Sequence, residues 1–133
     1  DKACTVFDFG TTLTIDFLGV DGRYLGGNIS LGCRTRTKAL ERYSKNLPLI
    51  DTPVSVQPEG TSLESSIGSG VVLGIIFEIE GYIKAHGENI VIFTGGDAIY
   101  FAKRMKSSIF VVCNLELMGL AIITDDYVKK IIG

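Results

Sequence analysis

The residues best suited to chemistry stand close together near the start of the chain, where Asp8, Gly10 and Thr11 occur within four positions. A carboxylate supplies a negative oxygen for a cation, and glycine lets a ligand approach the backbone without a Cβ in the way. Threonine adds a hydroxyl beside exposed amides. The same spacing also occurs in ordinary hairpin turns, so it indicates either a ligand-binding hairpin or a plain turn.

A second candidate site follows the apolar segment 89–93, which ends in Thr94, Gly95, Gly96 and Asp97. Paired glycines between a buried strand and a helix present free amides and the positive end of a helix dipole to an anion or nucleotide. A simple strand-to-helix turn produces the same pattern. The motif alone therefore does not distinguish an anion-binding or nucleotide-binding site from a simple strand-to-helix turn.

Both sites need a sheet to hold them in place. Strand-favouring composition and apolar runs predict five strands, at residues 3–7, 13–18, 24–30, 89–93 and 109–112. Helical periodicity predicts four helices, at about residues 34–44, 64–86, 98–106 and 116–132. Within the third strand, Gly26 and Gly27 mark either a bulge or close backbone approach, or simple sheet packing.

The first predicted helix is basic, and it admits two interpretations. Its charges form a solvated face or a surface that steers phosphate. The basic residues in and after it are Arg34, Arg36, Lys38, Arg42 and Lys45.

The longest predicted helix follows a loop at residues 46–60 that contains all three prolines. Thr61 and Ser62 offer hydroxyls that can cap its exposed amides. Three glycines lie in its first half: Gly68, Gly70 and Gly74. Each glycine lowers helix stability by about 1 kcal/mol relative to alanine. We therefore expect close helix packing to compensate, either within the chain or across a subunit interface.

Length, charge and composition narrow the class of protein. A chain of 133 residues fits one domain, and 13 basic against 15 acidic residues leave no excess positive charge for nucleic acid or an anionic membrane surface. The apolar segment 71–83 contains glycines and glutamates, so we interpret it as a buried helix; a membrane span needs about 20 largely uncharged residues.

Cysteine and histidine usage gives no metal motif. Cys4, Cys33 and Cys113 are odd in number and widely spaced, and His86 is the only histidine. His86 lies near a predicted helix end, where capping or exposure is expected. The pattern is typical of reduced thiols in a cytoplasmic protein.

Taken in order, these motifs resemble the C-terminal half of type III pantothenate kinases and the related Bvg accessory factor proteins. The segments that carry the resemblance are residues 8–16, 26–32, 47–48, 60–70 and 94–97. It implies an α/β fold, the ribonuclease-H-like half of the sugar kinase, Hsp70 and actin ATPase superfamily. In this fold a three-stranded meander is followed by alternating helices and strands.

The resemblance implies ATP-dependent phosphorylation of pantothenate, the first committed step towards coenzyme A. Asp8 would bind a monovalent cation, potassium or ammonium, while Gly10 and Thr11 would contact nucleotide phosphate. Gly95 and Gly96 would lie along the nucleotide cleft. Magnesium would accompany ATP, and the family implies a homodimer whose active site lies between subunits.

Two family motifs have no counterpart here, the upstream Asp-x-Gly-Asn-Thr and the Gly-x-Asp-Arg that contains the general base. We therefore expect residues 1–133 to be one domain, the C-terminal half of a two-domain kinase without its N-terminal half. No catalytic residue is expected in it, and it should be inactive alone. Leu31 replaces a usual proline, and Leu63 replaces a threonine that reaches the partner subunit's pantothenate; Thr61 or Ser62 could substitute for that threonine.

Two other functions stay open from the sequence. The first is a non-catalytic nucleotide-binding or regulatory protein of the Bvg accessory factor type, which would bind ATP without turnover. The second is a generic sugar kinase of the same superfamily, although no sugar-binding segment is apparent.

Overall fold

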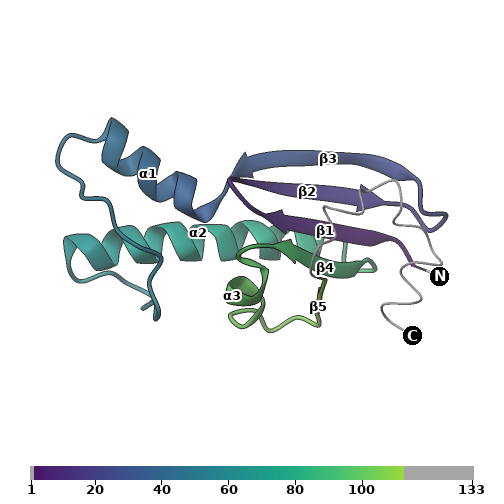
Figure 1. The fold of residues 1–133 in the computed structure, drawn as a ribbon. Helices are drawn as coiled ribbons and strands as arrows, with labels where there is room; N and C mark the ends of the chain where they lie inside the picture. Colours follow the sequence, from purple (N-terminus) through teal and green to yellow (C-terminus); the bar gives the residue numbers. More distant parts are fainter. Residues whose placement is uncertain (1, 113–133) are drawn as a thin grey trace.

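The computed structural model describes residues 2–112, which form a five-stranded sheet with three helices (Figure 1). The strand order is β3-β2-β1-β4-β5. Strands β1, β2 and β3 form an antiparallel meander, and β4 and β5 continue the sheet in parallel with β1. The strands are β1 (Cys4–Phe9), β2 (Thr12–Leu18), β3 (Tyr24–Leu31), β4 (Ile90–Gly95) and β5 (Phe110–Val111). The mixed α/β class and all five strands are thereby confirmed.

The helices are α1 (Cys33–Tyr43), α2 (Leu63–Ala85) and α3 (Ala98–Ala102). The first two agree with prediction, and residues 46–60 form the expected loop. The prediction for the third helix was too long, because it ends at Ala102. There the backbone tightens, with Arg104 N donating to Phe101 O. The helix predicted at residues 116–132 and the thiol of Cys113 lie outside the described residues.

Side chains alternate across β1 and fill two separate cores. Phe7 and Phe9 join the larger cluster beneath the sheet, whereas Cys4 and Val6 join a smaller cluster on the opposite face. Cys4 and Cys33 are both buried, as predicted for them. A strand buried on both faces is fixed in register, since a one-residue slip would exchange its two sets of side chains.

Aromatic rings hold the centre of the larger core. The Phe9 ring lies 4.7 Å from Phe93 and 5.1 Å from Phe101, and Phe7 lies 5.4 Å from Phe93, measured between centroids. Offset and edge-to-face pairs of this kind contribute about 0.5–1.5 kcal/mol each beyond their buried area. They join β1, β4 and α3 into one unit.

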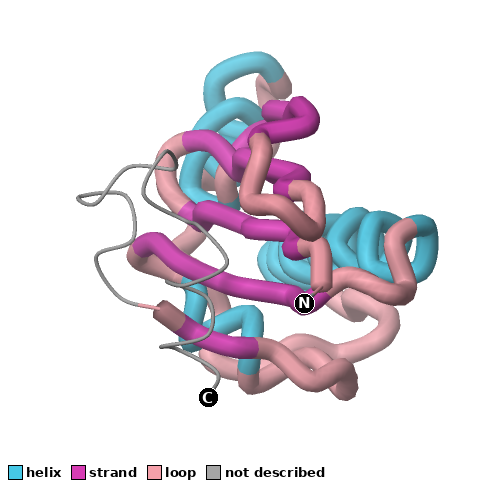
Figure 2. The backbone as a smooth tube through the Cα atoms, turned by 90° about the vertical axis from the view of Figure 1, so that its right-hand side faces the viewer, coloured by secondary structure: helices cyan, strands magenta, loops and turns pink. Residues whose placement is uncertain are grey.

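Helix α2 runs along one face of the strands (Figure 2). Ser62 caps it, because its hydroxyl accepts a hydrogen bond from the Ser65 amide. The Ser65 hydroxyl in turn accepts one from the Ser62 amide. By length and composition α2 could cross a membrane, but eight of its residues are buried in the protein. This agrees with the prediction of a buried helix. A Cβ on Gly68 would lie 3.2 Å from Pro53, whereas one on Gly70 would meet no neighbour within 4 Å.

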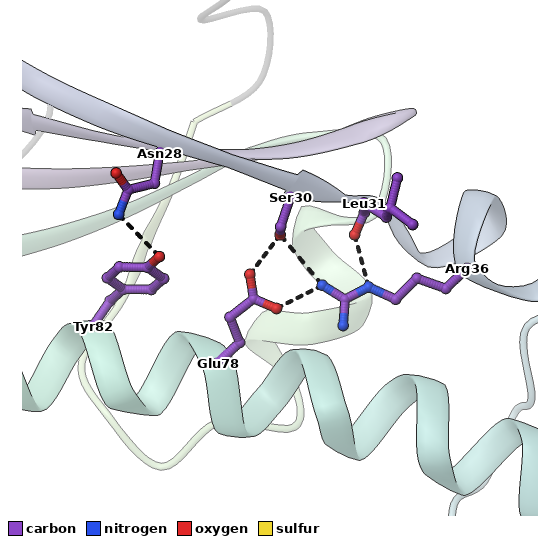
Figure 3. A network of polar contacts seen from close by, with 6 residues as sticks. All are labelled: Asn28, Ser30, Leu31, Arg36, Glu78 and Tyr82. Carbon is purple, nitrogen blue, oxygen red and sulfur yellow. Dashed lines mark hydrogen bonds and ion pairs between the residues drawn. The ribbon is translucent and has the colours of Figure 1, made fainter. Parts of the chain in front are cut away.

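A polar network joins α1, β3 and α2 (Figure 3). The Arg36 guanidinium lies 2.6 Å from a Glu78 carboxylate oxygen and donates to the Leu31 carbonyl at 2.8 Å. Ser30 donates to the same carboxylate. The Arg36 side chain is only 19% exposed, so neither a solvated face nor phosphate steering describes this residue. Arg34 likewise bonds the Ile50 carbonyl.

The opposite sheet face carries a half-buried carboxyl group, Asp16, to which the Tyr24 hydroxyl donates. A Cβ on Gly27 would lie 2.5 Å from the Asp16 carboxylate, and Gly26 has a φ of 133°. The pairing register also shifts beside Leu18. The sequence prediction of a bulge or a close approach at these glycines is confirmed.

Replacing Glu78 by alanine should destabilise the fold by about 1–3 kcal/mol, because Arg36 would keep a poorly hydrated charge without its counter-ion. Urea denaturation would measure the loss. Glu80→Ala is the matched control, since Glu80 is exposed on the same helix and should change stability by less than about 0.5 kcal/mol. Equal effects of the two substitutions would show that the network contributes nothing.

Asp16→Asn should flatten the pH dependence of stability. Burial raises the pKa of Asp16 above its ordinary 3.8, so its contribution to stability is fully present below the unfolded pKa and is lost as pH rises through the folded pKa. The asparagine variant should lose less stability between about pH 4 and pH 7, as measured by thermal unfolding. Asp21→Asn, in the exposed turn of the same hairpin, should keep the wild-type slope. An Asp16→Asn slope as steep as wild type would refute this.

Candidate functional site

The carboxylate of Asp8 lies on the sheet face opposite α2. Asp8 pairs with Thr14 of β2 on one side and with Thr94 of β4 on the other. Residues paired in this way point to the same face of a sheet. That face therefore presents two hydroxyls on either side of a half-buried carboxylate.

Gly95 ends β4 directly beside Asp8. It has a φ of 94°, and a Cβ there would lie 2.6 Å from Asp8 Oδ1 and 2.6 Å from the Phe9 carbonyl. Only glycine fits this conformation and this space. The structure thus brings together two sequence-predicted residues that are far apart in the chain.

Gly96, also predicted to bind nucleotide, lies near the same carbonyl. A Cβ on Gly96 would lie 4.0 Å from the Phe9 oxygen, and the Asp97 amide donates to that oxygen at 3.4 Å. Burial raises the pKa of Asp97. Because α3 has only five residues, its dipole contributes less than that of the longer predicted helix would.

Gly10 and Thr11 form the exposed tip of the β1–β2 hairpin. The Thr11 carbonyl accepts from the Gly32 amide at 3.0 Å and from the Thr35 hydroxyl at 2.6 Å. A Cβ on Gly32 would overlap the hairpin backbone. The first turn of α1 therefore fixes the hairpin from behind and leaves its tip open to a ligand.

Thr94 was part of a predicted motif but received no role from the sequence. Its side chain is buried, and its hydroxyl has no hydrogen-bond partner among residues 2–112. A threonine before paired glycines is the only local signal. Its position beside Asp8 depends on the parallel pairing of β4 with β1.

Thr61 and Ser62 lie apart from this group. Both line a cavity of about 570 Å³ between the 46–60 loop and the start of α2, beyond the sheet (Figure 1). The Ser62 hydroxyl is engaged in the helix cap. No hydrogen bond of the Thr61 hydroxyl is found within residues 2–112. Leu63 is half-exposed at the first position of the helix.

Residues 2–112 hold no group of three His, Cys, Asp or Glu side chains that could bind a metal ion. A cation beside Asp8 would therefore need hydroxyl, carbonyl or phosphate oxygens for its other ligands. The Phe9 carbonyl and the Thr94 hydroxyl are both present at this corner, so the donor set suits a hard, weakly charged ion.

Known proteins similar to this chain agree on one family. The family model for type III pantothenate kinase matches residues 1–85. A type III pantothenate kinase of Azobacteroides pseudotrichonymphae genomovar. CFP2 is 44% identical over 118 residues, covering 86% of this chain and 48% of the relative. The enzyme of that name from Cytophaga hutchinsonii is 43% identical, covering 86% of this chain and 50% of the relative.

A solved structure is also similar in fold. It is a conserved putative Baf family transcriptional activator from Campylobacter jejuni, with a TM-score of 0.65 and 27% identity over 98% of this chain and 57% of that one. The present chain spans about half the length of the curated relatives it matches. With the family model covering most of its residues, the chain belongs to the type III pantothenate kinase family.

Proposed function

We propose that the full-length protein transfers the terminal phosphate of ATP to pantothenate, the step that commits pantothenate to coenzyme A. The observation that carries this proposal is the corner where the Asp8 carboxylate, the Phe9 carbonyl and Gly95 meet beside an open hairpin tip. Phosphoryl transfer depends mainly on positioning and charge neutralisation. In this proposal the groups at the corner position the phosphate, and an ion held by Asp8 neutralises its charge.

Each residue has a distinct role in this proposal. The Thr11 amide and hydroxyl hold nucleotide phosphate beside Gly10, whose own amide donates to the Thr12 carbonyl at 3.0 Å, and the Gly95–Gly96 corner lies along the nucleotide. Asp8 holds a potassium or ammonium ion, which when bound offsets phosphate charge, while magnesium arrives with ATP. The fit is supported by a half-buried carboxylate with neutral oxygens around it.

We further propose that residues 1–133 form one domain, the C-terminal half of a two-domain kinase with the ribonuclease-H-like fold. The strand order and the half-length coverage of the relatives support this. The general base and the first phosphate-binding motif then belong to the other half. Residues 1–133 alone are accordingly not expected to phosphorylate pantothenate. A buried reduced thiol at Cys33 suits a cytoplasmic enzyme.

A homodimer would form along the outer face of α2. A Cβ on Gly70 or Gly81 meets nothing within 4 Å, and Phe77, on the same side of the helix, is 64% exposed. Small residues beside an exposed aromatic ring suit close packing of a second helix. Thr61 is the better substitute for the family threonine, because Ser62 is occupied by its cap.

A regulatory role is the second candidate, favoured by the name of the similar Campylobacter jejuni structure. In that case the corner would bind ATP without turnover, and pantothenate would not stabilise the protein.

The full-length protein should form phosphopantothenate from ATP only when potassium or ammonium is present, as a coupled ADP-release assay would show. Asp8→Asn should lower kcat/KM at least about tenfold in potassium by removing the only charged cation ligand proposed. Asp21→Asn, which removes a charge from an exposed turn, is the control and should leave the rate unchanged. Turnover that is independent of both cations would contradict the proposed role of Asp8.

Phe77→Asp should weaken self-association at least about tenfold, because a charge would be placed in the proposed helix contact. Sedimentation velocity across a concentration series would measure this. Tyr43→Asp, an exposed aromatic position on α1, should leave the dimer intact. A dimer equally tight in both variants would show that α2 is not the interface.

A further inference from the structure

Thr94 is the one buried side chain of residues 2–112 whose polar atom has no hydrogen-bond partner. It is 2% exposed, so water does not satisfy the hydroxyl either. Leaving a buried hydroxyl unsatisfied costs about 1–3 kcal/mol. Valine has nearly the same shape and suits a buried strand, so packing alone gives no reason for threonine here.

The Thr94 side chain lies beside Asp8, and this position indicates a role for its hydroxyl. Thr94 is the register partner of Asp8, on the adjacent parallel strand and on the same sheet face. Neighbouring strands lie about 4.8 Å apart, so the two side chains stand next to each other. The Asp8 carboxylate also leans towards β4, because Asp8 Oδ1 lies only 2.6 Å from where a Gly95 Cβ would be.

The chemistry of the pair suits a monovalent cation. Such ions are held largely by neutral oxygens, with little need for several carboxylates. An oxygen without a hydrogen-bond partner keeps its lone pairs available for an ion. The next residues on this face of β1 and β4, Val6 and Ile92, are apolar and buried.

We propose that the Thr94 hydroxyl is a direct ligand of the same monovalent cation that Asp8 binds. This inference rests on the proposed function, because it names a second protein ligand for the ion in that site. The carboxylate supplies charge, and the threonine oxygen fixes where along β4 the ion sits. Ion binding would then satisfy the hydroxyl that the protein alone leaves without a partner.

The test is thermal unfolding of the full-length protein titrated with potassium chloride, with choline chloride holding ionic strength constant. A ligand that binds the folded state raises the unfolding temperature according to its affinity. Thr94→Val should raise the potassium concentration for half-maximal stabilisation about tenfold, the cost of one bond to a charged group. Without potassium it should be as stable as wild type or more so, since the unsatisfied hydroxyl is gone.

Thr94→Ser keeps the hydroxyl and should keep the wild-type potassium response, despite losing a methyl group. Asp8→Asn distinguishes a failure of the proposed Thr94 role from a failure of the cation site itself. If Asp8→Asn abolishes the response and Thr94→Val leaves it unchanged, Thr94 is not a ligand although the cation site stands. If neither variant changes the response, the cation site itself is wrong. A Thr94→Ser response as weak as that of Thr94→Val would also overturn the role of the hydroxyl.

Discussion

The parallel pairing of β1 with β4 is the constraint on which the candidate site depends. It places Asp8 against Thr94 and Phe9 against Gly95, so a carboxylate, a hydroxyl and a glycine corner meet at one end of the sheet. The register is held by side chains on both faces, with Phe7 against Phe93 below and Val6 beside Ile92 above. Sliding one strand by a residue would bury the carboxylate among aromatic rings, which its desolvation would oppose.

Local pattern was sufficient to predict the strands and most of the helices. Apolar runs in residues 3–7, 13–18 and 89–93 are short-range signals, and a strand is found at each, although β1 continues through Asp8 and Phe9. The proximity of Asp8 to the Gly95 corner is different, because it depends on strand order. The sequence suggested it only through resemblance to a family, and the one local signal for Thr94 was its place before paired glycines.

The predictions that failed concern interactions between distant residues. Four of the basic residues in and after α1 are exposed, as the solvated-face interpretation expected, but Arg36 is not, because α2 brings Glu78 to it. The third helix was predicted too long, since its composition allows more turns than the tight backbone after Phe101 permits. Charge and propensity are local quantities, and in both cases the tertiary structure decides.

Helix α2 separates the two parts of the proposed active site within a single chain. The Asp8 corner lies at the sheet, whereas Thr61 and its cavity lie at the far start of a 23-residue helix that extends beyond the sheet (Figure 1). In the proposed dimer, a second copy packs on the open face of the same helix, at Gly70 and Gly81. Helix α2 therefore carries the Thr61 cavity at its start and the proposed dimer face along its length.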